Sequence, residues 1–258
     1  MANLTKIHDA VYAKISSLQD YTYLLMDICK NILSVKNNWT DTLKEMYVIG
    51  TKALMLVTLG GLFCGIILAI EAGHNLEMFG ATTLIGHTVS LGMIRELGPV
   101  ITGLLLASRT GAKNTSEIGA MQLSEQIDAL RAFGISPVEK LVIPRLVAAI
   151  IMFFPLTLIA DIAGFLGGML STYQTFHVDY SFFWDSAIRV LKMKDLFVGC
   201  IKPIFFAFFI SSISCYYGLT TRGGTTDLGK KSINAVVVSS IVVLALDFIF
   251  TKVVWELM

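Results

Sequence analysis

The chain has 258 residues and a formal net charge of +1, and 55% of its residues are hydrophobic. Soluble domains use about 45–50% apolar residues, so this composition and a mean hydropathy of +0.71 indicate an integral membrane protein. Because a spanning helix needs ~20 apolar residues, the length allows five spans and excludes a separate ATPase domain. The balanced charge excludes a nucleic-acid-binding surface, which needs concentrated Lys and Arg.

Residues 1–46 form the predicted N-terminal region, an amphipathic helix that lies in the membrane interface. Apolar residues at spacings of three and four put one face in lipid, while lysines on the other positions face anionic head groups. The apolar face consists of Leu4, Ile7, Val11, Ile15 and Leu18, then Leu24, Leu25, Ile28 and Ile32. A helical hairpin packed on a soluble partner is the alternative. Trp39 and Tyr47 are suited to the entry into the bilayer, as interfacial aromatic residues.

Residues 47–258 are predicted to form an all-α transmembrane domain with five spans. The expected spans are residues 53–70, a second centred on 98–107, then 146–170, 196–219 and 233–250. In the first span, Gly61 and Gly65 would permit the close approach of another helix. Lys and Arg are concentrated in the N-terminal region and in the loops 109–145 and 222–231. The positive-inside rule therefore predicts a cytoplasmic N-terminus and a C-terminus on the far side.

The uncharged run 78–94 is short for a span and leads into Gly98-Pro99, a pair that disfavours helix. We predict a broken or re-entrant segment here, before the second span. Non-helical backbone at this depth must line a cavity or be buried in protein. The segment therefore indicates a pocket.

Charged side chains within the spans cost about 2.5–3.5 kcal/mol each on insertion scales unless they are paired or hydrated. Arg95 has donors suited to a lipid phosphate, and Glu96 would neutralise it in the empty site or meet an ethanolamine group. The alternative is a structural pair of Arg95 with Glu96 that closes the helix break. For Asp161, Lys202 and Asp247 we favour structural pairs between helices over a proton or ion relay.

The polar loop 109–145 contains a short amphipathic helix. Its predicted features are the N-cap Ser124, the first-turn acids Glu125 and Asp128, the terminating Gly134 and Pro137, and an apolar side with Ile127, Leu130 and Phe133. A helix this short is marginal alone in water, so we expect it to bind a partner protein. The alternative is a helix resting on lipid head groups, which its acids disfavour because the inner leaflet is anionic.

Six motifs of this region occur in a characteristic order. They are RELGPV at 95–100, ASRTGA at 107–112, EIGAM at 117–121, EQIDAL at 125–130, GISP at 134–137 and PR at 144–145. In this order and spacing the chain resembles the MlaE/YrbE family of ABC transporter permeases. The similarity continues through Lys202, residues 217–219 and 222–224, and Asp247, and covers about residues 45–252.

The resemblance implies a homodimeric permease subunit that is not itself an enzyme. It would move glycerophospholipid between the inner membrane and the outer envelope with a cytoplasmic ABC ATPase, which holds ATP and Mg²⁺, and a substrate-binding protein with an Mce-type domain. The short loop helix would be the coupling helix. The implied ATPase-coupling residues are Glu117, Glu125, Gln126, Asp128 and Leu130, and the implied lipid-binding residues are Arg95, Glu96 and Leu97. The location would be the inner membrane, or the inner envelope of a plastid.

Other function classes find less support in the sequence. Residues 224–231 approach a phosphate-binding loop, but Lys231 occupies the Ser/Thr position and the segment follows a span instead of a strand. The four cysteines are far apart, and neither a G-x-S-x-G nor an H-E-x-x-H motif is present, so we assign no catalytic or metal-binding residues. The alternative function is an independent secondary transporter, or a lipid-modifying membrane enzyme that uses Arg95, Glu96 and Asp161.

Overall fold

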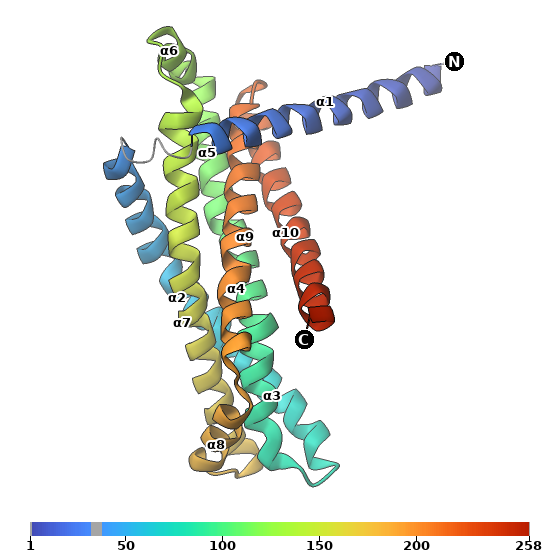
Figure 1. Ribbon diagram of the computed structural model, residues 1–258. Helices are drawn as coiled ribbons and strands as arrows, with labels where there is room; N and C mark the ends of the chain where they lie inside the picture. The colour runs from blue at the N-terminus through green and yellow to red at the C-terminus, as the bar shows by residue number, and fades with distance from the viewer. Residues whose placement is uncertain (1, 32–37, 258) are drawn as a thin grey trace.

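Five long helical segments form a bundle with one short helix at each end (Figure 1). The computed structural model describes residues 2–31 and 38–257, without the side chains of residues 2–14, 254, 255 and 257. The five segments are Trp39–Glu77 (α2), Thr82–Leu123, Val138–Phe176, Met193–Leu219 (α9) and Gly224–Val253, the last within α10 (Gly224–Leu257). No strand occurs in the described ranges. The all-α prediction with five spans is confirmed.

Small residues bring α2 against α7 (Ile143–Phe176), which follows the π-helical turn η5 (Val138–Val142). A Cβ atom at Gly61 would overlap the backbone of Ala160, and one at Gly65 would overlap the backbone of Gly164. The two backbones therefore touch, as expected for helices that pack in lipid through glycine. The prediction for Gly61 and Gly65 is confirmed. α2 begins at Trp39, so the end of the predicted N-terminal region shares one helix with the first span.

The second span is one helical run that contains two π-helical turns. In order it comprises η2 (Thr82–Leu84), α3 (Ile85–Gly92), the π-helical turn η3 (Met93–Leu97), α4 (Gly98–Leu106), the π-helical turn η4 (Ala107–Gly111) and α5 (Ala112–Leu123). This run therefore forms one continuous span and not a re-entrant loop. The irregularity predicted before the second span takes the form of the wider turn η3, which keeps the backbone hydrogen-bonded.

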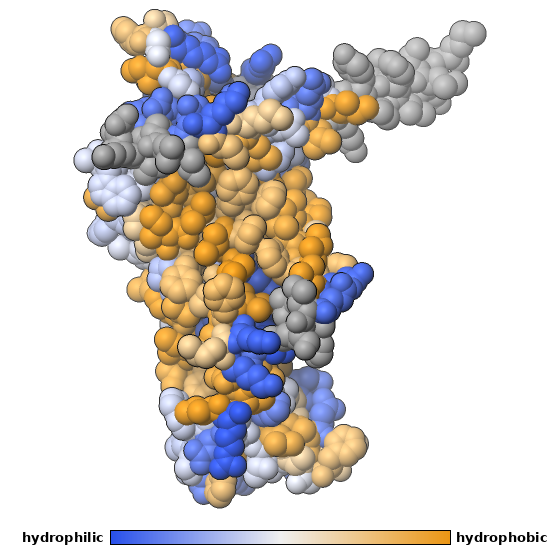
Figure 2. Space-filling model, viewed as in Figure 1, coloured by the Kyte–Doolittle hydropathy of each residue, from blue (hydrophilic) through white to orange (hydrophobic). Residues whose placement is uncertain are grey.

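The two short helices mark opposite ends of the bundle (Figure 1). α6 (Gln126–Ala132) follows α5, and α8 (Tyr180–Val190) joins α7 to α9. α10 runs from the α6 end toward the α8 end. Figure 2 shows hydrophobic surface over much of the middle of one face, with hydrophilic residues around both ends. This distribution is that of a protein whose middle lies in hydrocarbon.

α1 (Ala2–Asn31) crosses the bundle near α6 and extends away from it (Figure 1). Its second half packs on the bundle, where Leu24 and Ile28 are buried with Ile127 of α6. Tyr21 also shares a 2.8 Å hydrogen bond with Ser212 of α9. Of the predicted apolar face, the side chains of Leu4, Ile7 and Val11 and the whole of Ile32 lie outside the described part of the chain.

Candidate functional site

A buried ammonium group organises the charges of the spans. Lys202 of α9 is fully buried, and its Nζ donates to Glu96 Oε2 at 2.9 Å and to Asp247 Oδ1 at 2.8 Å. The same Nζ donates to the Arg95 carbonyl at 2.7 Å and to Thr251 Oγ1 at 3.1 Å. Two carboxylates and two further oxygens thus surround a charge that would be very costly alone. The cluster ties the second, fourth and fifth spans together.

Proline explains why a side chain reaches the Arg95 carbonyl. In an α-helix this carbonyl would accept the N–H of the residue four positions later, which is Pro99 and has none. The Gly98 N–H instead bonds to Met93 O across the wider turn η3. Lys202 supplies the missing donor at 2.7 Å. The helix therefore continues through Gly98-Pro99 where the sequence predicts a break.

Arg95 and Glu96 turn to different partners. Arg95 Nε donates to Asp195 Oδ1 at 2.7 Å, and its Nη2 contacts the same oxygen. Asp195 is almost completely buried in the first turn of α9 and also accepts the backbone N–H of Lys192 at 3.0 Å. Glu96 faces Lys202 instead. The expected pair between Arg95 and Glu96 is replaced by two pairs that each reach another span.

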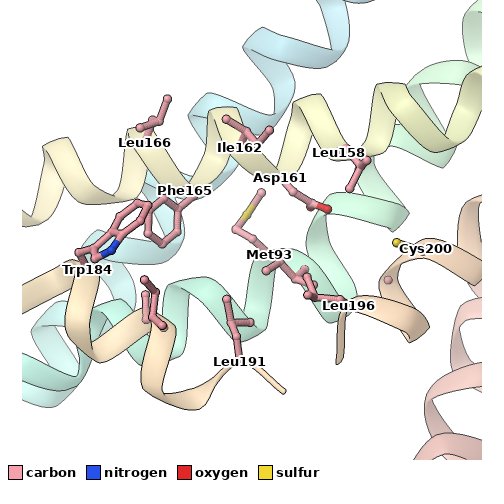
Figure 3. Close-up of a pocket in the computed structure, with 14 residues that line it drawn as sticks. Met93, Leu158, Asp161, Ile162, Phe165, Leu166, Trp184, Leu191, Leu196 and Cys200 are labelled. Atoms are coloured by element: carbon pink, nitrogen blue, oxygen red, sulfur yellow. The ribbon is translucent and has the colours of Figure 1, made fainter. Parts of the chain in front are cut away.

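An apolar cavity of about 400 Å³ opens beside η3, between α7, α8 and α9 (Figure 3). Its lining includes Met93, Ile94, Phe165, Trp184, Ala187 and Gly199. Met93 and Ile94 belong to the same turn as Arg95 and Glu96, so this turn contributes residues to both the cavity and the ion cluster. Leu97, at the end of the turn, is partly buried and packs against the core that contains Met93. The predicted pocket is present, although no re-entrant loop forms it.

Asp161 lines this cavity and does not join the ion cluster. Its side chain is 9% exposed, and within the described residues Oδ1 has no hydrogen-bond partner. The carboxylate lies so close to Gly98 that a Cβ atom there would overlap it. Among the described residues Asp161 has no ion-pair partner, unlike Lys202 and Asp247.

The helix of the polar loop begins differently from the prediction but ends at the predicted glycine. Ser124 is not its N-cap, because Glu125 occupies that position and the Ser124 hydroxyl donates back to the Ala120 carbonyl of α5 at 2.9 Å. Glu125 makes the turn between the helices with a left-handed φ of 59°, and α6 has only seven residues. Gly134, with a φ of 73°, ends it as predicted: its N–H bonds to Arg131 O and the next N–H to Leu130 O.

α6 has a buried face and an exposed face. Ile127 is fully buried and Leu130 packs beside it, on the core shared with α1. Glu125, Gln126 and Asp128 are exposed, and a cavity of about 400 Å³ separates this acidic face from residues 221–222. Phe133 was predicted on the side of Ile127, but it is 82% exposed at the tip of the bundle.

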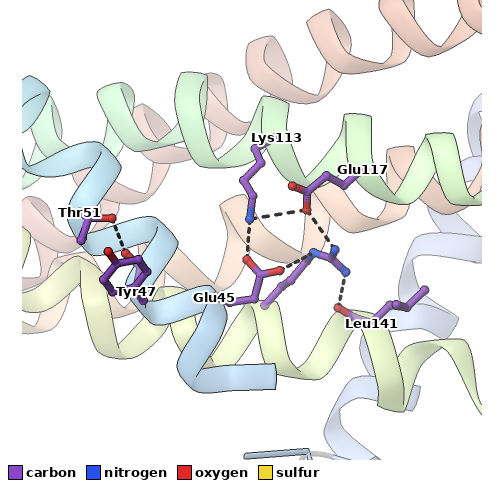
Figure 4. Close-up of polar contacts among 7 residues, drawn as sticks. Glu45, Tyr47, Thr51, Lys113, Glu117 and Leu141 are labelled. Carbon is purple, nitrogen blue, oxygen red and sulfur yellow. Dashed lines mark hydrogen bonds and ion pairs between the residues drawn. The ribbon is translucent and has the colours of Figure 1, made fainter. Parts of the chain in front are cut away.

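Glu117 lies away from α6, in a charge cluster that joins α2, α5 and α7 (Figure 4). Lys113 Nζ lies 2.6 Å from Glu45 Oε2 and 3.5 Å from Glu117 Oε2. Arg145 lies 3.1 Å from Glu117 and 3.4 Å from Glu45, and it also donates to the Leu141 carbonyl. Two cations and two carboxylates therefore balance one another. Arg145 belongs to one of the six sequence motifs but was given no role from the sequence, and Glu45 was not singled out.

A five-span helical bundle with a buried ion cluster beside a membrane-level cavity has the features of a membrane transport protein. The family model described as Permease MlaE matches residues 42–253. The chain belongs to this family of ABC transporter permeases, and as such it is a transport subunit and not itself an enzyme. The prediction of the family is confirmed.

Named relatives agree with this assignment. The chain is 35% identical to a probable ABC transporter permease protein of Rickettsia typhi, over 83% of each chain. It is 32% identical to the intermembrane phospholipid transport system permease protein MlaE of Haemophilus influenzae, over 86% of this chain and 85% of that one. It is 34% identical to the chloroplastic protein TRIGALACTOSYLDIACYLGLYCEROL 1 of Arabidopsis thaliana, over 86% of this chain and 63% of that protein.

Proposed function

We propose that this permease moves glycerophospholipid between the inner membrane and the outer envelope. The observation that carries the proposal is the position of Arg95, on the turn that borders an apolar cavity of about 400 Å³. A phospholipid combines an anionic phosphate with acyl chains, and Arg95 follows the cavity-lining residue Ile94 on the same turn. The Haemophilus influenzae relative is named as an intermembrane phospholipid transport permease, which supports the same substrate class.

In the proposed complex, an acyl chain occupies the cavity and the phosphate lies at Arg95. A guanidinium has five N–H donors in a planar fork, so one group is able to contact a carboxylate and a phosphate together. Asp195 would hold the guanidinium in place, as its contacts with Nε and Nη2 suggest. Lys202 and Glu96 would fix the backbone of η3 and serve as the frame of the site.

We further propose that α6 is the coupling helix for a cytoplasmic ABC ATPase that holds ATP and Mg²⁺. The support is its exposed face of Glu125, Gln126 and Asp128, together with Phe133 at the tip. An exposed phenylalanine at a polar end is typical of a protein interface. The α6 end would then be cytoplasmic, in line with the Lys and Arg distribution. The α8 end would face the Mce-type substrate-binding protein.

The test measures phospholipid transfer and assembly in the complex reconstituted with its ATPase and Mce-domain partner. Arg95→Ala is expected to lower transfer about tenfold or more without loss of assembly, since a hydrogen bond to a charged group contributes roughly 1.5–3 kcal/mol. Asp195→Ala and the double variant are the controls. If both single variants fail to assemble and the double variant restores assembly with normal transfer, Arg95 is half of an ordinary ion pair and the lipid site is refuted.

A further inference from the structure

A basic groove lies at the α6 end of the second span, between α2 and the turn η4. It has a volume of about 250 Å³ and is lined by three cations, Lys52, Arg109 and Lys113, together with Val48, Ile49, Thr110 and Glu117. Arg109 is fourteen positions beyond Arg95 on the same helical run, which corresponds to roughly 20 Å. The groove is therefore separate from the cavity beside η3.

Two of the three cations in this groove have no carboxylate partner among the described side chains. Lys113 belongs to the balanced cluster with Glu45, Glu117 and Arg145. Lys52 and Arg109 are exposed, and no ion pair joins either of them to a carboxylate among the described side chains. The groove thus has two positive charges to offer an anion. A phosphodiester complements them, because Arg binds phosphate through two donors and Lys adds a point charge.

Below Lys52, an apolar stripe runs along the exposed side of α2. Its members recur at spacings of three and four, which places them on one face of the helix with Lys52. They are Met55, Leu56, Leu59, Phe63 and Ile67, each more than one third exposed. On the other side of Lys52, Tyr47 is 72% exposed, as an interfacial aromatic residue would be. Lys52 therefore lies at the level where head groups meet hydrocarbon.

We propose that Lys52 and Arg109 bind the phosphate of a phospholipid in the leaflet at the α6 end, with its acyl chains along the α2 stripe. Charge complementarity favours an anionic phospholipid such as phosphatidylglycerol. The lipid would be a resident of the permease, because it lies outside the cavity where we place the transported molecule. The site does not require that the transported substrate be a phospholipid.

Native mass spectrometry of the delipidated full-length permease, titrated with phosphatidylglycerol, tests the site. Lys52→Gln/Arg109→Gln is expected to retain one phosphatidylglycerol fewer per chain than the wild type. The matched control Lys44→Gln/Lys230→Gln removes two exposed cations of the same end and should keep that lipid. Adding Lys52→Gln/Arg109→Gln to Arg95→Ala should remove one phosphatidylglycerol beyond any loss caused by Arg95→Ala alone, which separates this site from the proposed transport site. Equal lipid counts in the wild type, the control and Lys52→Gln/Arg109→Gln would overturn the proposal.

Additional ligands and readouts in the same experiment distinguish a phospholipid from other ligands of the groove. Diacylglycerol, which lacks the phosphate, should not bind in a manner that depends on these two cations. Inorganic phosphate that binds alone with the same dependence would identify a free-phosphate site and refute the lipid assignment. A change in the dimer fraction with no change in lipid count would assign the groove to a contact between copies. If the double variant does not fold, Lys52→Gln alone should weaken phosphatidylglycerol binding several-fold, and unchanged binding would refute the site.

Discussion

Lys202 is the residue on which the ion cluster depends. Its Nζ has four oxygen partners, and without it Glu96 and Asp247 would face each other with no cation and the Arg95 carbonyl would lose its donor. Breaking a buried ion pair by removing one partner costs on the order of 3–5 kcal/mol. We therefore expect Lys202→Met to lower the unfolding temperature of the purified permease strongly. Lys252→Met, at an exposed position of α10, should change it little.

The charge balance supplies a sharper check on Lys202. Replacing all three charges, as Lys202→Met/Glu96→Gln/Asp247→Leu, should recover part of the stability lost in the single variant. If Lys202→Met melts at the wild-type temperature, the cluster does not stabilise the fold and the account of η3 is wrong.

For single residues, the sequence identifies which charged side chains in the spans need a partner, but it does not identify that partner. Charge within an apolar run identifies Arg95, Lys202 and Asp247, because such charges are costly in lipid. Asp195, however, which pairs with Arg95, lies 100 positions away, and tertiary packing alone brings the two together. A local signal for Asp195 did exist, since an acid in the first turn of a helix is favourable. It indicates a helix start and says nothing about Arg95.

α6 is the helix for which we predict binding of the ATPase. Glu125→Lys/Asp128→Lys should reduce co-purification of the ATPase about tenfold or more, because it reverses the charge of the exposed face while Ile127 stays buried. The matched control is Asp20→Lys/Asp27→Lys, which reverses two exposed acids of α1 at the same end. Equal ATPase recovery from both double variants would show that α6 is not the coupling surface.

Helix types and their order follow from the hydrophobic pattern, whereas local irregularities do not. The five spans are long apolar runs, so their existence is predictable and only their ends extend beyond the expected ranges. The Gly98-Pro99 pair predicts a break, but Lys202 replaces the missing donor from another helix. α8 was not predicted, because its mixture of aromatic and charged residues is too short and too polar for a span.

The whole molecule has exposed apolar surface on the last span that suits a second copy. Ile233, Val237, Ile241, Leu244 and Phe248 of α10 are each about half exposed or more. We expect two copies of the permease in each purified complex, because ABC ATPases would bind one to each α6 and two chains would enclose a phospholipid better than one. Native mass spectrometry of the intact complex measures this directly. A single copy per particle would contradict the homodimer.

Occupation of the cavity beside η3 by a transported phospholipid can be measured directly by photocrosslinking. A photoreactive phenylalanine derivative at Ile188, which lines the cavity, should crosslink phospholipid in the reconstituted complex. The matched position is Ile151 of α7, which is 39% exposed and lies outside both the cavity lining and the α10 face assigned to the second copy. We expect crosslinking at 188 to fall several-fold with Arg95→Ala and during ATP turnover, while crosslinking at 151 stays constant. Equal and unchanged crosslinking at both positions would mean that only bulk lipid meets the cavity, and would contradict the account.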